Sequence, residues 1–182
     1  MEPRRQGIKS RKFAYHPTFF ILKSFQYAMY MIAVLFLLLL FQAPFLWLAG
    51  FMALFFVLLL VFGMSPLFTA HELTARRLIV RQGWYFQLSI PLRTIKEVHP
   101  LDHGRAGLKS AFGRPAIYVT SAESGLVQIK LKKPVRLALL LGKSVDEVII
   151  NVNERERLLE MMGERLHSLQ SMPSVRAPSL GM

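Results

Sequence analysis

The 182-residue chain contains no cysteine and, over one long internal stretch, no charge of either sign. The absence of cysteine excludes disulfides, thiolate catalysis and cysteine-bound zinc or iron–sulfur centres, and it leaves the redox compartment open. Acidic residues are also few, with 11 Asp and Glu against 23 Lys and Arg. Hydrophobic residues make up 53% of the chain. This combination is typical of a membrane protein with basic parts in water and excludes a soluble single-domain enzyme.

Residues 24–68 contain no Asp, Glu, Lys, Arg or His. One straight helix of this length would reach roughly 68 Å, about twice the hydrocarbon core of a bilayer. The stretch therefore has to fold back, and Gln42-Ala43-Pro44 is the best place for the turn, because proline lacks the N–H that a continuous helix needs. We predict two transmembrane helices near 24–42 and 46–66. Neither contains an ionisable residue, which indicates an anchor rather than a transport pathway.

Basic residues flank the apolar stretch on both sides, whereas its central turn is uncharged. Six Lys or Arg precede the first predicted helix, and Arg76, Arg77 and Arg81 follow the second. The positive-inside rule then predicts a multi-pass protein of the cell membrane with both termini cytoplasmic. A cleaved signal peptide is the alternative, but Leu40-Phe41-Gln42 lacks the small residues of a cleavage site. An uncleaved hairpin is therefore favoured.

After residue 69 the apolar residues alternate with polar ones, which is typical of β-strands. Every second residue from Trp84 to Ile90 is apolar, and so is every second residue from Val127 to Leu131. Together with five further segments, these two predict seven short strands. The further segments are 73–80, 94–101, 116–122, 135–141 and 147–152, of which 135–141 fits a helical turn equally well.

A final amphipathic helix is predicted after Asn153. Asn153 suits the N-cap position, Glu156 follows at the capping-box position, and Leu and Met return at helical spacing from Leu158 to Leu169. Residues 171–182 contain two prolines and three serines without periodicity, which predicts a disordered tail. The predicted organisation is α+β, with a basic segment 1–23, a hairpin 24–68, a cytoplasmic domain 69–170 and the tail.

Two segments, Leu73 to Trp84 and Ile90 to Val98, resemble the opening strands of bacterial pleckstrin-homology-like (PH-like) domains. That family often places such a domain directly after two membrane helices. The resemblance extends from the hairpin through the closing helix and implies a PH-like seven-stranded bent sheet or barrel closed by the C-terminal helix. It also implies that the protein has no enzymatic activity, and it carries no functional residues over to this chain.

No catalytic or metal-binding constellation is evident in the sequence. Gly142-Lys143-Ser144 lacks the earlier glycine of a phosphate-binding loop, and His71-Glu72 lacks the second histidine of a zincin helix. Pro100 prevents the regular helix that would align His99 with His103 around a metal ion, and Asp102 between them adds no cluster. We therefore predict no enzyme activity, no cofactor and no metal site.

The charge distribution is the strongest functional signal. Residues 69–144 contain 13 Lys and Arg against 4 Asp and Glu, whereas residues 145–182 contain 4 against 6. A basic face near the bilayer would meet the anionic cytoplasmic leaflet, where each cation contributes on the order of 1 kcal/mol, although the positive-inside bias explains the pattern almost equally well. The candidate residues for binding anionic lipid or a partner are Arg76, Arg77, Arg81, Arg105, Lys109, Arg114, Lys130, Lys132 and Lys133.

The stretch 102–115 is predicted to be a long loop that meets a partner or a lipid headgroup. Its three glycines free the backbone, and Arg105, Lys109 and Arg114 place three cations on one flexible segment. A disordered loop without a binding role would have the same composition.

The expected function is that of a membrane-anchored binding or assembly module. It would recognise an unidentified protein partner at the cytoplasmic membrane surface with its basic face toward anionic lipid. The alternative is an accessory or regulatory subunit of a membrane transporter or enzyme complex, in which the small residues Ala49, Gly50 and Ala53 would let a partner helix approach. Nucleic acid is not expected as a partner, and the oligomeric state stays open.

Overall fold

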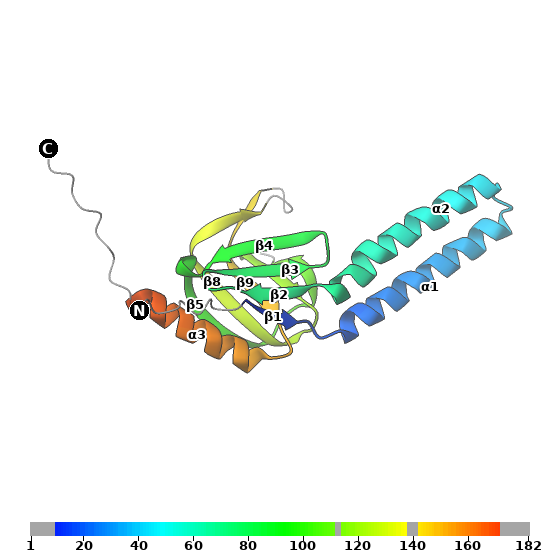
Figure 1. Ribbon diagram of the computed structural model, residues 1–182. Coiled ribbons are helices and arrows are strands. Elements are labelled where there is room, and N and C mark those ends of the chain that lie inside the picture. Colours follow the sequence, from blue (N-terminus) through cyan, green and yellow to red (C-terminus); the bar gives the residue numbers. More distant parts are fainter. Residues whose placement is uncertain (1–9, 112–113, 138–141, 172–182) are drawn as a thin grey trace, which may run out of the picture.

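Two long apolar helices project from one end of a strand-rich domain in an α+β architecture (Figure 1). The computed structural model describes residues 10–111, 114–137 and 142–171. Helix α1 covers Thr18–Leu40, and α2 covers Phe45–Leu58. A π-helical segment η1 (Leu59–Met64) and a 3-10 turn η2 (Ser65–Phe68) extend α2 toward the sheets. We call α1, α2, η1 and η2 together the apolar hairpin.

The turn of the apolar hairpin lies where the sequence predicts it. Gln42 adopts a positive φ of 51°, and Pro44 directly precedes α2. Both helices start earlier than predicted, at Thr18 and Phe45, and the second extends to Phe68. Pro66 does not end it sooner, because proline lies at the start of the 3-10 turn, where its missing N–H costs nothing.

The two helices of the hairpin could cross a membrane. They contain 23 and 24 residues, and most of their large apolar side chains are exposed. A protein surrounded by water rarely exposes a contiguous apolar surface of this extent. These helices are therefore suited to a lipid environment by their length and composition.

Nine strands in the described ranges form two open sheets. The first sheet has the order β1-β2-β3-β4 and the second the order β5-β8-β9-β7-β6, with the 3-10 turn η3 (Leu92–Thr94) between β4 and β5. All neighbours are antiparallel except β7 and β9, which are parallel. The strands of the first sheet are β1 (Arg11–Ala14), β2 (Ala70–Leu73), β3 (Arg77–Gln82) and β4 (Phe86–Pro91). Those of the second are β5 (Ile95–His103), β6 (Gly107–Ser110), β7 (Ala116–Thr120), β8 (Ser124–Leu137) and β9 (Lys143–Asn151).

The predicted seven strands and barrel closure are both wrong for these residues. β1 precedes the hairpin and escapes prediction because Phe13 is its only buried residue, so that no alternation marks it. β6 lies in the stretch predicted to be a loop. The predicted strand 73–80 divides into β2 and β3 at a turn, in which the Thr74 hydroxyl donates to the carbonyl oxygen of Arg77.

Two further strand predictions change in detail. Trp84 does not share the buried face of Phe86, because it lies in the turn between β3 and β4 and is 67% exposed. β8 continues to Leu137, so residues 135–137 are strand, while the rest of the segment 135–141 lies outside the described residues.

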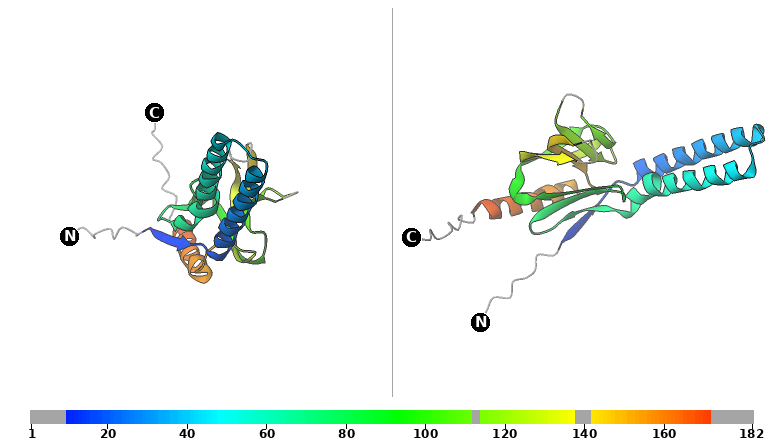
Figure 2. Two further views of the ribbon diagram at one scale, coloured as in Figure 1. Left: turned by 90° about the vertical axis from the view of Figure 1, so that its right-hand side faces the viewer. Right: turned by 90° about the horizontal axis from the view of Figure 1, so that it is seen from above.

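The core lies between the two sheets and helix α3 (Arg155–Ser171), which packs along one side of them (Figure 2). Leu158 and Met162 of α3 are fully buried, and Leu159, Leu166 and Leu169 pack against the same core. The predicted apolar stripe of the last helix is therefore confirmed. The helix begins at Arg155 rather than directly after Asn153, so the predicted N-cap is wrong, and residues 172–182 of the predicted tail lie outside the described part.

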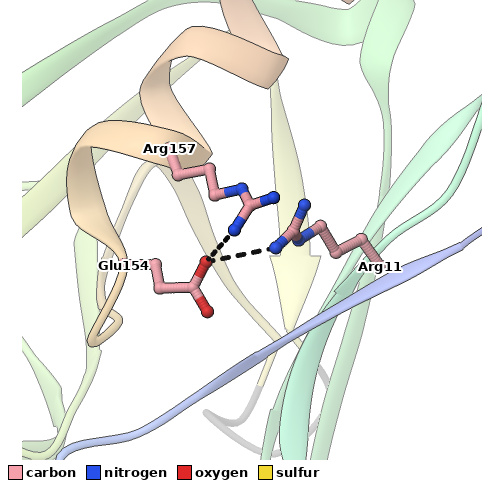
Figure 3. A network of polar contacts seen from close by, with 3 residues as sticks. All are labelled: Arg11, Glu154 and Arg157. Atoms are coloured by element: carbon pink, nitrogen blue, oxygen red, sulfur yellow. Dashed lines mark hydrogen bonds and ion pairs between the residues drawn. The ribbon is translucent and has the colours of Figure 1, made fainter.

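The start of α3 is tied to β1 at the other end of the sequence. Arg11 and Arg157 both donate to Oε2 of Glu154, at 3.3 and 3.2 Å (Figure 3). The backbone N–H of Asn153 donates to the carbonyl oxygen of Ala14 at 3.1 Å. Ion pairs this exposed contribute little to stability, so the burial of Phe13 is the larger attachment of β1.

Candidate functional site

The base of the apolar hairpin is hydrogen-bonded to the turn between β3 and β4. The Ser65 hydroxyl oxygen accepts from the N–H of Trp84 at 3.1 Å, and the Thr69 hydroxyl oxygen accepts from the N–H of Gly83 at 3.0 Å. Gly83 has a φ of +61°, and a Cβ atom at this position would clash with Ser65 and Tyr85. Only glycine fits here, and the hairpin thereby meets the first sheet through a fixed turn.

A cavity of about 260 Å³ lies at this meeting point, and we call it the junction cavity. Its walls come from the first turns of α1, from η1, from the β3–β4 turn, from the segment around β6 and from the residue before β8. The lining residues are Phe19, Phe20, Lys23, Tyr27, Phe62, Gln82, Tyr85, Ala106, Gly107, Leu108, Lys109 and Glu123.

The junction cavity contains both cations and hydrogen-bond acceptors. Lys23 and Lys109 bring two ammonium groups, and Glu123 brings one carboxylate. Gln82 is only 2% exposed, and its Oε1 atom has no hydrogen-bond partner among the described residues. Burial, and to a smaller extent the proximity of Tyr27, raises the pKa of Tyr85 to about 12. Its hydroxyl is therefore a neutral donor at pH 7.

A second cavity, of about 380 Å³, is lined by three arginines. Arg77 is the first residue of β3, Arg76 directly precedes it in the turn after β2, and Arg93 lies in η3. The β3–β4 hairpin brings them together, because Arg77 is opposite Pro91 in the strand register. Pro91 and Leu169 of α3 form the apolar part of the wall. We call this cavity the arginine pocket.

The arginine pocket lies at the end of the domain away from the apolar hairpin. Its elements, the start of β3, η3 and the last turns of α3, are opposite the helices in Figure 1 and in the right view of Figure 2. None of its three arginines forms an ion pair with another residue of the described ranges, whereas Arg11, Arg155 and Arg157 all do.

Two further cations adjoin the arginine pocket. Lys132 lines a cavity of about 70 Å³ together with Arg93 and Leu169. Arg165 donates to the carbonyl oxygen of Thr74, and burial lowers the pKa of its guanidinium while Glu164 opposes that shift. This end of the domain is therefore strongly basic.

The nine cations predicted from the sequence do not form one face. Arg76, Arg77 and Lys132 lie at the arginine end, and Lys109 lies in the junction cavity. Lys130 is 3.7 Å from Glu97 and already has a carboxylate partner. The other four lie apart from both cavities: Arg81 is half-buried on β3, and Arg105, Arg114 and Lys133 are exposed.

The prediction of a single flexible loop at 102–115 is wrong. β5 extends to His103, and residues 107–110 pair with β7 as β6. Only Lys109 of the three predicted loop cations lines the junction cavity, while Arg114 lies in the turn at the other end of the β6–β7 hairpin. The pairing of β6 with β7 therefore separates cations that the sequence places on one segment.

No group of three His, Asp or Glu side chains within the described ranges is placed to hold a metal ion. Nε2 of His99 lies 3.2 Å from Oε2 of Glu97. This contact lowers the pKa of the Glu97 carboxyl, and Lys96 lowers it further. Asp102 lies 3.5 Å from Arg155.

Sequence reasoning missed Arg93, Gln82 and Glu123 as site residues. Arg93 could have been found from the β3–β4 hairpin, since pairing β3 with β4 brings the residues after Pro91 beside the start of β3. Gln82 and Glu123 carry no local signal, because their position at the hairpin base depends on contacts between distant segments.

No protein-family model, curated protein or solved structure matches this chain, so its function has to be inferred from the geometry of these two cavities.

Proposed function

We propose that this protein is a membrane-anchored binding module whose arginine pocket recognises an acidic segment of a protein partner at the cytoplasmic face of the membrane. One observation carries the proposal. Three arginines that have no ion-pair partner among the described residues converge on one cavity, at the end of the domain away from the apolar hairpin.

The chemistry of the pocket matches a chain of carboxylates. Guanidinium groups bind carboxylates through two parallel hydrogen bonds, and such charge-assisted bonds are about twice as strong as neutral ones. Three like charges around one cavity repel one another unless an anion lies between them. Pro91 and Leu169 offer an apolar wall to the rest of a bound peptide.

The position of the pocket favours a protein over the protein's own membrane lipid. We propose that the apolar hairpin spans the bilayer with both ends cytoplasmic, because its flanks are basic and its turn is uncharged. The arginine pocket then faces away from the bilayer that holds the hairpin. We also propose that the sheet domain is PH-like, a proposal supported by its two packed sheets and its C-terminal helix.

Photocrosslinking in native membranes tests the proposal. A photoreactive residue in place of Leu169, which lines the pocket, should crosslink to a protein whose labelled segment is rich in Asp and Glu. Combining it with Arg76→Glu, Arg77→Glu and Arg93→Glu should abolish the product. The matched control, Lys12→Glu, Arg105→Glu and Arg114→Glu, changes the charge equally at exposed sites outside the pocket and should leave the product intact.

Two results would contradict this function. The first is a crosslinked product that survives the reversal of all three pocket charges. The second is a labelled segment without acidic residues, because three arginines would then have no electrostatic reason to select it.

A second function, as an accessory subunit of a membrane complex, is favoured by the surface of α2. A shallow cavity of about 440 Å³ is lined by Leu46, Trp47, Gly50, Phe51 and Leu54. Apart from the adjacent residues and backbone of α2 itself, no described atom lies within 4 Å of a Cβ placed at Gly50. A partner helix could approach closely there. Gly50→Leu should then release a co-purifying membrane protein, whereas Phe56→Leu, also on the exposed surface of α2, should not.

A further inference from the structure

The junction cavity lies at the level of the lipid headgroups when the apolar hairpin spans a bilayer. Helix α1 from Lys23 to the turn at Gln42 is about 30 Å long, which equals the thickness of the hydrocarbon core. Lys23, at one end of this length, then lies at the boundary between hydrocarbon and headgroups, as do the residues around it in the cavity. Tyr27, one turn further along α1, is of the type enriched at this boundary.

The charges of the junction cavity fit one negative charge. Lys23 and Lys109 outnumber Glu123, which leaves the cavity with an excess of one positive charge. The diester phosphate of a glycerophospholipid carries one negative charge. Its acyl chains would leave along the aromatic residues Phe62 and Tyr27, which line the side of the cavity formed by the hairpin.

The acceptors of the cavity require more than a phosphate. The buried Oε1 atom of Gln82 has no hydrogen-bond partner among the described residues, and a buried acceptor without a donor is unfavourable. Glu123 adds a second acceptor at the same cavity. A phosphate has only acceptor oxygens, so a ligand that also donates to Gln82 has to carry its donor on the part of the headgroup beyond the phosphate. Hydroxyl groups suit this role better than an ammonium, because two ammonium groups already face one carboxylate.

We propose that the junction cavity binds the headgroup of one anionic glycerophospholipid that carries hydroxyl groups, such as phosphatidylglycerol. Its phosphodiester interacts with Lys23 and Lys109, and its hydroxyls donate to Gln82 and Glu123. This site rests on the membrane anchoring in the proposed function and is independent of the arginine pocket.

The matched pair of lipids for the test is phosphatidylglycerol and phosphatidylmethanol, which have the same charge and differ in the headgroup hydroxyls. Native mass spectrometry of the full chain in detergent measures the affinity for each lipid. We expect phosphatidylglycerol to bind about five- to tenfold more tightly, a ratio typical of one or two additional hydrogen bonds.

Variants of the protein distinguish the contribution of the phosphate from that of the headgroup hydroxyls. Gln82→Met should bring the affinity ratio of the two lipids close to one while leaving phosphatidylmethanol binding unchanged. Lys109→Gln should weaken both lipids by a similar factor. Gln87→Met, on the exposed face of β4, is the control and should change neither affinity. Glu123→Ala removes an exposed acceptor and should also lower the preference for phosphatidylglycerol over phosphatidylmethanol. Because the residue is exposed, this variant can be measured even if Gln82→Met unfolds the protein.

Soluble glycerophosphoglycerol, the same headgroup without acyl chains, distinguishes a lipid site from a site for a free phosphodiester. It should displace phosphatidylglycerol only at much higher concentration, and competition at equal concentration would overturn the lipid assignment.

Equal affinity of the wild type for both lipids, or an unchanged ratio in both Gln82→Met and Glu123→Ala, would overturn the proposal. These measurements need no protein partner, so a failed crosslink at the arginine pocket leaves them unaffected, and carbonate extraction of the chain from membranes tests the anchor separately.

Discussion

Phe13 lies opposite His71 in the antiparallel register of β1 and β2, and both side chains are almost completely buried. β1 precedes the apolar hairpin and β2 follows it. The two ends of the hairpin are therefore joined by one β-ladder, which requires them to lie on the same side of any membrane that the helices cross.

The absence of cysteine makes this topology directly testable. A single cysteine at Ala43, in the hairpin turn, should react with a membrane-impermeant maleimide added to intact cells. A single cysteine at Ser89, exposed on β4, should react only after the membrane is permeabilised. Labelling of Ser89→Cys in intact cells would contradict the proposed cytoplasmic position of the sheets.

Truncation of Phe13 should strongly destabilise the domain. Its ring is 1% exposed and belongs to the main core, and loss of a buried Phe typically costs about 3–5 kcal/mol. We expect Phe13→Ala to lower the unfolding midpoint of the full chain in detergent. Circular dichroism of the sheets measures this midpoint. Trp84→Ala, at an exposed turn position, is the control and should leave the midpoint nearly unchanged. Equal midpoints for the two variants would show that β1 is only loosely attached.

Acidification should destabilise the domain through His71. Burial lowers the pKa of His71 to about 3, and the nearby backbone of Asn151 opposes the shift. Nδ1 of His71 accepts a hydrogen bond from the N–H of Arg81 at 3.3 Å. In the unfolded chain His71 takes up a proton near pH 6.5, whereas in the folded chain it does not. The contribution of neutral His71 to stability is therefore fully present above pH 6.5 and is lost as the pH decreases toward 3. The expected loss is about 1.4 kcal/mol per pH unit in this range, or about 2 kcal/mol at pH 5.

Denaturation curves at pH 7 and pH 5 measure this effect. His71→Asn keeps an acceptor near the position of Nδ1 and should reduce the difference between the two curves. His99→Asn, at an exposed site of β5, should keep the full difference. If the wild type and His71→Asn lose stability equally between the two pH values, the pH dependence has another origin.

Leu158 should contribute more to stability than its neighbour Leu159. Leu158 is fully buried, whereas Leu159 is half-buried at the edge of the same core. Leu158→Ala should cost about 2–5 kcal/mol in the free energy of unfolding, with a smaller loss for Leu159→Ala. Glu160→Ala, on the exposed face, serves as the control in the same denaturation experiment. An unchanged midpoint for Leu158→Ala would show that α3 does not support the core.

The sequence predicts those parts of the fold whose signal is local. The uncharged stretch and its Gln42-Ala43-Pro44 turn indicate the apolar hairpin, and the alternation from Phe86 to Ile90 indicates a buried strand. β1 and β6 have no such signal. Both are four-residue strands that form through pairing with β2 and β7, and the pattern within each strand is too short to show a period.

The candidate site is less predictable than the fold, for a related reason. Charge counts identify the basic domain but not which cations converge, because Arg76 and Arg93 meet only through the register of β3 with β4. The junction cavity depends on still more distant contacts, between α1, the β3–β4 turn and β6. A buried amide such as that of Gln82 is visible only once those elements are placed.

The pairing of β1 with β2 also sets an order on synthesis at the ribosome. β1 emerges first, but its partner strand is translated only after the whole apolar hairpin. The first sheet therefore stays incomplete while the apolar hairpin is translated, and Phe13 has no core to join until β2 has followed. A chain whose two helices fail to fold back as a hairpin would keep β1 separated from β2 and expose an unpaired strand edge, the kind of surface by which quality-control proteases and chaperones recognise unassembled proteins.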